Sequence, residues 1–327
     1  MTEPLALADV EAAAARIAPH VETTPLLEAP LLDAEIGFRL LVKAENLQPI
    51  GAFKLRGAFN QILQLTEEER RRGVIAVSSG NHAQAVAYAA RAMGVAATIV
   101  MPQDAPRVKL ARTKALGARV EYYDRLSNDR DALSRRLAER EGLRFIHPYD
   151  DPLTIAGQGT IGLEIFAQTR AKGVAPDAII ASCSGGGLAS GIALTLGLYS
   201  RAPRMFTAEP AGFDDMRRSL ESGVAQANAA LAGSICDALL APTPGRHTLP
   251  ILLACGARGL AATDAQVEAA MRVAAEHFRL VLEPGGAAAL ACALVERERF
   301  AGRTVIVIAS GGNVDRKDFA AILDRSS

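Results

Sequence analysis

The chain has 327 residues, half of them hydrophobic, which is enough for two α/β domains that share a cleft. Its 36 Lys and Arg residues equal its 36 Asp and Glu residues, so no overall field would attract nucleic acid or an anionic membrane. No apolar run reaches the ~20 residues that span a bilayer, and the N-terminus does not read as a basic segment followed by an apolar core. We therefore expect a cytoplasmic protein with a small-molecule partner.

The four cysteines, Cys183, Cys236, Cys255 and Cys292, are far apart in the sequence. They form no Cys-x-x-Cys pair of the kind used for zinc binding or redox work. We expect them to be reduced and mostly to be small core residues.

Residues 51–58, Gly-Ala-Phe-Lys-Leu-Arg-Gly-Ala, place Lys54 among small and apolar neighbours. An amine becomes a nucleophile at neutral pH only when desolvation or a nearby cation lowers its pKa, and Arg56 is the cation at hand. The motif therefore indicates a lysine that forms a Schiff base. Taken alone, a solvated surface lysine is the commoner outcome.

Apolar runs alternate with alanine-rich ones from about Gly73 onward. Spacing of this kind predicts parallel sheets with helices on both faces. The predicted strands are residues 74–77, 97–101, 119–122, 178–181, 204–208 and 304–308, and residues 83–93 are predicted to be helical. The charged stretch 124–144 predicts a solvated helix that ends before His147-Pro148, with a domain crossing nearby.

Ser78, Ser79, Asn81 and His82 follow the first of these strands and open a helix. Their hydroxyl and N–H groups would suit a substrate carboxylate. A simple Ser/Asn helix cap is the alternative, and it is the more common one for such a segment on its own.

The segment Ser184-Gly185-Gly186-Gly187-Leu188 comes after the strand at 178–181. Glycines between a strand and a helix let backbone N–H groups approach a phosphate. The spacing of Gly185, Gly187 and Gly191, with Glu209 ending the next strand, also resembles a dinucleotide fingerprint, so a nicotinamide-dependent oxidoreductase is an alternative. Ser190 at the position of the third glycine argues against it.

Two further sets of polar residues follow predicted strands in the C-terminal half of the chain. Glu209 and the pair Asp214-Asp215 lie close enough in sequence to share a hard cation such as Mg²⁺, although surface acids are commoner. Ser310 begins a Ser-Gly-Gly-Asn turn that would place a hydroxyl where a ring nitrogen can dock, and a simple strand-ending turn is an equally common alternative. A neutral hydroxyl would not keep that ring protonated, which favours β-elimination over transamination.

Taken together, these motifs resemble the fold-type II pyridoxal-phosphate (PLP) family of threonine and serine dehydratases and serine racemases. The resemblance covers nearly the whole chain. In chain order, the matching segments are 53–58, 78–84, 147–148, 156–160, 184–188, 283–284 and 310–313.

The resemblance implies an α/β fold like that of tryptophan synthase β, with two open, twisted, mostly parallel sheets. It implies a large cofactor domain made of residues 1–49 and 146–327, and a small domain, residues 50–145, inserted in it. Lys54 would carry the Schiff base and move the α proton, and Ser79 would be the base on the opposite face. The other implied roles are cofactor binding by Phe53, Asn81, Ser184, Gly185, Gly186, Gly187, Leu188, Glu283 and Ser310, substrate binding by Ser78, Ser79, Asn81 and His82, and divalent-cation binding by Glu209, the Phe213 carbonyl and Asp215.

The implied activity is dehydration of a β-hydroxy amino acid, with L-threonine and L-serine first, to a 2-oxo acid and ammonia. Serine racemisation, dehydration of threo-3-hydroxyaspartate or of a hydroxyectoine-derived amino acid, and a non-catalytic amino-acid sensor are the alternatives. A homodimer is the usual assembly of the family.

The chain departs from the family pattern in two places. Ser184 stands where many relatives have a glycine, and Gly285-Gly286-Ala287 follows Glu283-Pro284 in place of the commoner sequences. The chain also ends soon after Asn313, so we expect no C-terminal regulatory domain.

Overall fold

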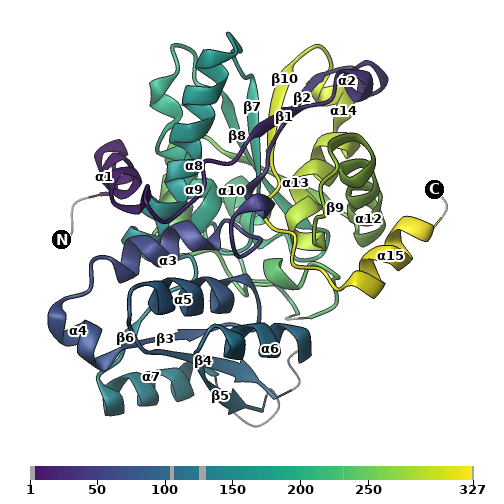
Figure 1. Ribbon diagram of the computed structural model, residues 1–327. Helices are drawn as coiled ribbons and strands as arrows, with labels where there is room; N and C mark the ends of the chain where they lie inside the picture. Colours follow the sequence, from purple (N-terminus) through teal and green to yellow (C-terminus); the bar gives the residue numbers. More distant parts are fainter. Residues whose placement is uncertain (1–3, 104–106, 125–129, 231, 326–327) are drawn as a thin grey trace.

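Two separate β-sheets organise the molecule (Figure 1). The computed structural model describes residues 4–103, 107–124, 130–230 and 232–325. The large sheet has the order β1 (Leu26–Glu28), β2 (Arg39–Lys43), β10 (Thr304–Ile308), β7 (Ala178–Ser182), β8 (Arg204–Pro210) and β9 (Arg258–Ala262). The small sheet has the order β5 (Arg119–Tyr123), β4 (Ala97–Pro102), β3 (Val74–Val77) and β6 (Arg144–Phe145).

The strand pairs of the described residues are parallel except that of β1 with β2, which is antiparallel. In the centre of the large sheet, Val307 is level with Val42 on one side and with Ile180 on the other. Parallel pairing needs crossover connections, which place helices on the faces of the sheet. The predicted fold class is therefore confirmed.

The helices form the crossovers and cover the sheets. They are α1 (Leu7–Ile17), α2 (Pro30–Ile36), α3 (Lys54–Ile62), α4 (Glu67–Arg72), α5 (Asn81–Ala92), α6 (Arg107–Ala115), α7 (Arg130–Glu141), α8 (Pro152–Ala171), α9 (Gly187–Ala193), α10 (Asp215–Ser222), α11 (Thr248–Ala254), α12 (Asp264–Val273), α13 (Pro284–Val295), α14 (Arg297–Phe300) and α15 (Arg316–Asp324). Short 3-10 segments are η1 (Glu45–Leu47), η2 (Leu196–Leu198) and η3 (Asp237–Leu239), and η4 (Ala274–Phe278) is a π-helical turn. None of the helices in the described ranges is long and apolar enough to span a membrane.

Local sequence explains where the long helix α8 begins. The Asp151 side chain accepts hydrogen bonds from the backbone N–H groups of Leu153, at 2.8 Å, and Thr154, at 3.2 Å. Pro152 occupies the first helical position, where its missing N–H costs nothing.

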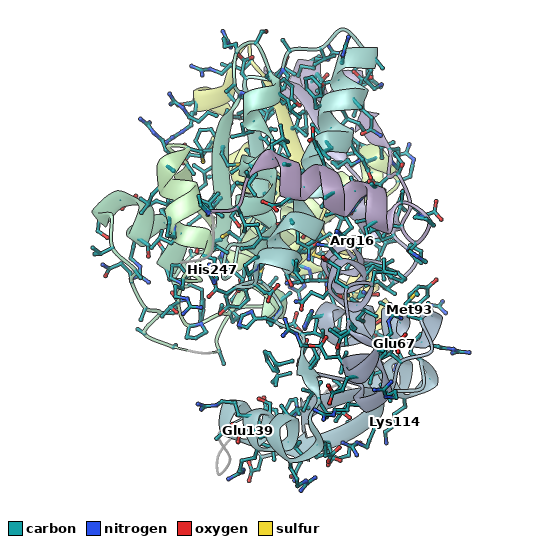
Figure 2. The ribbon with its side chains drawn as sticks, turned by 90° about the vertical axis from the view of Figure 1, so that its left-hand side faces the viewer. Arg16, Glu67, Met93, Lys114, Glu139 and His247 are labelled. Carbon is teal, nitrogen blue, oxygen red and sulfur yellow. The ribbon has the colours of Figure 1, made fainter. Side chains whose placement is uncertain are left out.

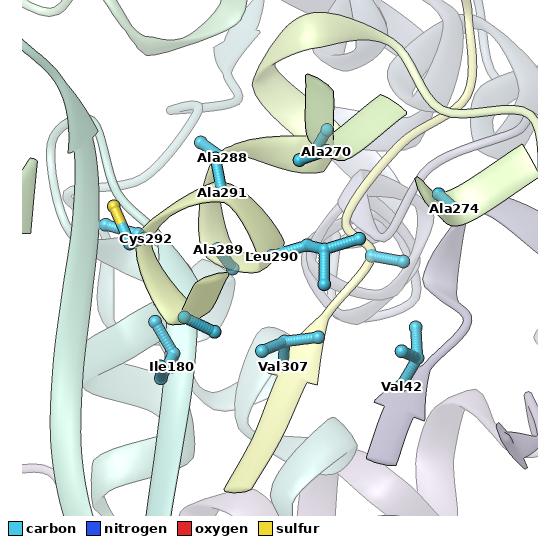
Figure 3. Packing of buried hydrophobic residues seen from close by; sticks show 14 of the residues in the cluster. Val42, Ile180, Ala270, Ala274, Ala288, Ala289, Leu290, Ala291, Cys292 and Val307 are labelled. Atoms are coloured by element: carbon cyan, nitrogen blue, oxygen red, sulfur yellow. The ribbon is translucent and has the colours of Figure 1, made fainter. Parts of the chain in front are cut away.

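The largest apolar core lies between α13 and one face of the large sheet (Figure 3). Helix α13 is rich in alanine, and Leu290 and Cys292 are buried among residues that include Val42, Ile180 and Val307. Small side chains let the helix axis approach the sheet closely. A second core covers the opposite face and includes residues of α8 and α9.

Helix α3 runs between the two sheets and packs against α8 of the large part and α5 of the small part (Figure 1). A Cβ on Gly157 would lie 2.8 Å from the Cα of Gly57, so α3 and α8 touch backbone to backbone. The side view shows Arg16 and His247 with the large sheet, and Lys114 and Glu139 with the small one (Figure 2). Division of the chain into domains at residues 50 and 145 stays a prediction.

Every predicted strand is present, and the predicted helix at 83–93 appears as α5. The charged stretch 124–144 differs from its prediction. Its helix, α7, covers Arg130–Glu141, and Arg144 belongs to strand β6, because Arg144 and Phe145 pair with Val74 and Ile75. Residues 125–129 lie outside the described part of the chain.

Candidate active site

The pocket at the edge of the large sheet lies between the two sheets and measures about 320 Å³. This volume is within the range of small-ligand sites. All residues predicted to bind cofactor or substrate line it: Phe53, Lys54, Ser78, Ser79, Asn81, His82, Ser184, Gly185, Gly186, Gly187, Leu188, Glu283 and Ser310. The fold thus brings together side chains that are far apart in sequence, and their individual roles remain predictions.

Lys54 is the first residue of α3, and its side chain projects into this pocket. Its Nζ donates a hydrogen bond to the Pro148 carbonyl oxygen at 2.6 Å and lies 5.1 Å from the centroid of the Phe53 ring. Burial disfavours the charged form and lowers the pKa of Lys54 from 10.5 to about 8. About a tenth of the amine is therefore uncharged at pH 7.

Arg56 does not have the role predicted for it, because its guanidinium is occupied elsewhere. It forms a two-point ion pair with Glu45, with both N–O distances 2.8 Å, and it contacts Glu164 at 2.7 Å. Residues i and i+2 of a helix point in different directions, so Arg56 faces the interior behind α3 while Lys54 faces the pocket. The low pKa of Lys54 comes from desolvation alone.

The loop after β3 and the first turn of α5 form the wall that carries Ser78, Ser79 and His82. The Ser78 hydroxyl accepts a hydrogen bond from the Gly80 N–H at 3.1 Å. His82 Nε2 donates to the Ile146 carbonyl at 2.9 Å, and burial, followed by the charge of Lys54, lowers the pKa of His82 to about 3. Neutral His82 thus has an unprotonated Nδ1, so the donors that this wall can offer to a carboxylate are backbone N–H groups and the hydroxyls of Ser78 and Ser79.

The glycine loop after β7 is in close contact with Tyr149, and a side chain on the loop would overlap that residue. A Cβ on Gly185 would lie 2.1 Å from Cε2 of Tyr149, and Gly186 has φ +97° as it caps α9. The Gly185 carbonyl accepts from the Thr248 hydroxyl at 2.6 Å. The Ser184 hydroxyl oxygen accepts from the Ala241 N–H at 3.0 Å, so its own proton is available to a ligand. A loop of this kind fits a phosphate group.

The pocket lining also contains three polar residues outside the glycine loop: Asn81, Glu283 and Ser310. Asn81 donates a hydrogen bond to the buried Glu283 carboxylate. The Ser310 hydroxyl is buried and makes a long bond, 3.5 Å, to the Gly285 carbonyl. Ser310 therefore offers a neutral donor to a ring nitrogen.

The acids predicted to bind a metal lie outside the lining of the pocket. Glu209 and Asp215 are fully buried, and Glu209 accepts from the N–H groups of Met216, at 2.9 Å, and Arg217, at 2.7 Å. Desolvation raises the pKa of Glu209, and it raises that of Asp215 to about 6. Within the described ranges, no group of three or more His, Cys, Asp or Glu side chains is arranged to hold a metal.

The sequence did not indicate several residues that line the pocket. Tyr149 closes it beside the glycine loop, and residues 237–242 form one wall. His147, whose Nδ1 accepts from the Asp150 N–H at 2.8 Å, is a neighbour of Tyr149 with ring centroids 4.9 Å apart. In the sequence, His147-Pro148 stands out as a turn signal and as a segment of the family resemblance, whereas Tyr149 and the loop 237–242 belong to no motif.

Comparisons with known proteins agree with this geometry. The family model described as "Pyridoxal-phosphate dependent enzyme" matches residues 17–311. The chain is 39% identical over 315 residues to an L-threo-3-hydroxyaspartate ammonia-lyase of a Pseudomonas species, covering 96% of this chain and 97% of the relative. It is 36% identical over 318 residues to a serine racemase of Schizosaccharomyces pombe, covering 97% of each.

Two solved structures are similar to this chain over nearly its whole length. A threonine deaminase from T.th. matches with a TM-score of 0.87 and 42% identity, over 95% of this chain and 99% of that one. Maize serine racemase matches with a TM-score of 0.90 and 35% identity, over 98% and 97%. These relatives give no support to the nicotinamide alternative, which is dropped.

Proposed function

Because this chain belongs to the family of pyridoxal-phosphate-dependent enzymes, we propose that it is a lyase that removes water from a β-hydroxy amino acid and releases a 2-oxo acid and ammonia. The observation that carries the proposal is the pocket of Lys54. An amine with a pKa of about 8 lies in one pocket with a glycine loop and with a helix N-terminus suited to a carboxylate. These are the groups needed to bind PLP and an amino acid together.

The residues present fit PLP, as the glycine loop that lines the same pocket as Lys54 and the lowered pKa of Lys54 indicate. When bound, PLP supplies a conjugated ring that accepts the electron pair left at the α carbon. Lys54 would hold the cofactor covalently, and it would take and return the proton of the substrate α carbon. The N–H groups of residues 184–188 would hold the phosphate.

Ser310 supports elimination in preference to transamination. Its neutral hydroxyl would offer a hydrogen bond to the ring nitrogen of the cofactor without keeping that nitrogen protonated, an arrangement that would favour loss of a β-hydroxyl over transamination. Ser79 lines the same pocket and would be the acid or base on the face opposite Lys54.

L-Serine and L-threonine are the leading substrates in this proposal. Serine and threonine have one carboxylate, whereas 3-hydroxyaspartate has a second one that would need a charged or multiply donating partner. Among the described residues of the lining, Lys54 is the only Lys or Arg, so the pocket offers no further cation for that second carboxylate. The 3-hydroxyaspartate ammonia-lyase relatives support threo-3-hydroxyaspartate as a second candidate. Serine racemisation and dehydration of a hydroxyectoine-derived amino acid are further outcomes that a substrate survey would reveal.

We also propose a divalent cation, such as Mg²⁺, held by Glu209, the Phe213 carbonyl and Asp215. Two adjacent buried acids repel each other, and Asp215 Oδ2 has no hydrogen-bond partner within the described structure. A cation would offset both costs. A cytoplasmic homodimer is proposed from the family resemblance.

The test is the release of 2-oxo acid and ammonia from L- and D-serine, L- and D-threonine and threo-3-hydroxyaspartate, with Mg²⁺ and with a chelator. Rapid release from L-serine or L-threonine is the expected result. Lys54→Ala should abolish both turnover and the yellow absorbance of bound PLP, while Lys317→Ala, which changes an exposed lysine, should preserve both. A Lys54→Ala variant that keeps turnover would refute the proposal.

Ser79→Ala separates two fates of the same substrate. Loss of racemisation with L-substrate dehydration retained would identify Ser79 as the opposite-face base. If racemisation also survives unchanged, Ser79 does not have that role.

A further inference from the structure

A continuous chain of hydrogen bonds links an exposed cation to an acid inside the pocket. Arg112 of α6 donates to Asn313 Oδ1 at 3.0 Å, and Asn313 Nδ2 donates to Asn81 Oδ1 at 2.8 Å. Asn81 Nδ2 in turn donates to Glu283 Oε1. The four side chains thus form a relay, Arg112–Asn313–Asn81–Glu283, in which every bond has the same direction.

The direction of the relay is fixed at both ends. A guanidinium only donates, so Arg112 requires the oxygen of the Asn313 amide to face it. Asn313 Nδ2 also donates to the Ile50 carbonyl at 2.8 Å, and a carbonyl only accepts. The Asn313 amide therefore has one orientation, and the Asn81 oxygen is held by a donor on one side while its nitrogen faces the Glu283 carboxylate on the other.

The backbone around the relay makes room for it. Gly51 has φ +73°, and a Cβ there would lie 2.8 Å from Asn313 Oδ1. A Cβ on Gly311 would lie 2.1 Å from Glu283 Oε1 and 3.0 Å from Asn81 Nδ2. Glycine at these two positions is thus needed for the side chains to meet.

A consequence follows for what Asn81 offers to a ligand. Its oxygen is occupied by Asn313, and one of its two N–H bonds is used by Glu283. One N–H bond is left, and Asn81 lines the pocket next to Lys54. Asn81 is therefore set to bind an acceptor and not a donor.

We propose that Asn313 is a positioning residue that fixes the amide of Asn81, so that Asn81 donates to the ionised 3-oxygen of the bound cofactor. This inference rests on the proposed function. PLP carries its 3-oxygen beside the carbon that Lys54 attacks, and an ionised oxygen is an acceptor only. With the Asn81 amide turned the other way, two lone pairs would face each other.

The test compares the affinity of the apoprotein for PLP and for 3-deoxypyridoxal 5′-phosphate, which lacks the oxygen. Both probes keep the phosphate and the aldehyde. Since a hydrogen bond to a charged group contributes about 1.5–3 kcal/mol, the wild type should bind PLP at least ~10-fold more tightly than the deoxy analogue. Asn313→Asp keeps the size of the side chain but replaces its donor by an acceptor, and it should reduce this ratio to near one.

The matched control is Asn46→Asp. Asn46 is half-buried, packs beside Gly312 and donates to the Val281 carbonyl at 3.2 Å, but it does not touch Asn81. It should leave the ratio of the two affinities unchanged. Asn313→Ala, which removes the donor without adding charge, gives the same comparison if Asn313→Asp does not fold.

The outcomes separate the two hypotheses. If the Asn313 variants weaken the binding of both probes equally, or weaken the binding of neither, the positioning role is overturned while the proposed function still stands. Failure of the wild-type protein to bind either probe would instead refute the proposed function.

Discussion

Replacing Arg56 by methionine should destabilise the protein strongly, because this guanidinium satisfies two buried acids. Arg56 is 1% exposed, and Glu45, which it binds through both oxygens, is fully buried. Its remaining donors bind Glu164, the Thr160 hydroxyl at 3.1 Å and the Glu22 carbonyl at 3.2 Å. All five N–H bonds of the guanidinium therefore have acceptors.

The magnitude follows from the charges that remain. Glu164 keeps its ion pair with Lys43, but Glu45 loses its ion-pair partner and stays buried. Removing one partner of a buried pair costs about 3–5 kcal/mol. Unfolding entropy of ~2.1 cal/mol/K per residue amounts to about 0.7 kcal/mol/K for this chain, so Tm should fall by about 4–7 °C.

The assay is thermal unfolding followed by circular dichroism at matched protein concentration. Arg201→Met is the control, because Arg201 pairs with Asp177 at a position where its side chain is 80% exposed, and Tm should change by less than about 1 °C. The double variant Arg56→Met/Glu45→Gln removes the orphaned charge and should be more stable than Arg56→Met alone. A fall of under about 1 °C for Arg56→Met, or a double variant that is less stable still, would refute the reasoning.

Three further predictions concern the pocket and the buried acids. Because burial lowers the pKa of Lys54 to about 8, reductive methylation of its amine in the apoprotein should reach half its maximal rate near pH 8, and a midpoint near 10.5 would contradict the desolvation argument. Gly185→Ala should weaken PLP binding at least ~10-fold in a fluorescence titration, because the new Cβ overlaps the Tyr149 ring, while Gly197→Ala, with nothing within 4 Å, should have no effect. Asp215→Asn should abolish any rise in Tm caused by Mg²⁺, and a variant that keeps the rise would exclude Asp215 as a ligand.

The sequence predicted strands well where apolar runs end in turn residues. Residues 74–77 and 304–308 have the bounds expected of them. Strand β2 was not predicted because charged residues flank its short apolar run. The buried ammonium of Lys43 is satisfied by distant acceptors, namely Glu164, 121 residues away, the Thr24 carbonyl and Gln168. Strand β9 consists largely of glycine and alanine, which have little preference for strands.

In the site, too, features set by local sequence were predicted and features set by distant residues were not. The pocket residues 78–82, 184–188 and Ser310 were identified because they follow predicted strands, and parallel strands bring such ends together, whereas Lys54 was identified from its own motif and Glu283 from the family resemblance. The prediction that Arg56 lies beside the Lys54 amine was wrong, because neighbours in sequence were taken as neighbours in space. Its partner Glu164 is 108 residues away, and nothing in the local motif points to it.

The contact between α3 and α8 determines which parts of the active site would move together. Gly57 and Gly157 bring the two backbones into contact, and the ion pair of Arg56 with Glu164 ties the same helices, so Lys54 is anchored to the body that carries the glycine loop. Residues 78–82, which are predicted to bind the substrate carboxylate, instead follow β3 of the small sheet. Any rotation of the small sheet would therefore move residues 78–82, including Asn81, relative to Lys54 and the glycine loop, and would strain the hydrogen bonds of Asn81 with Glu283 and Asn313.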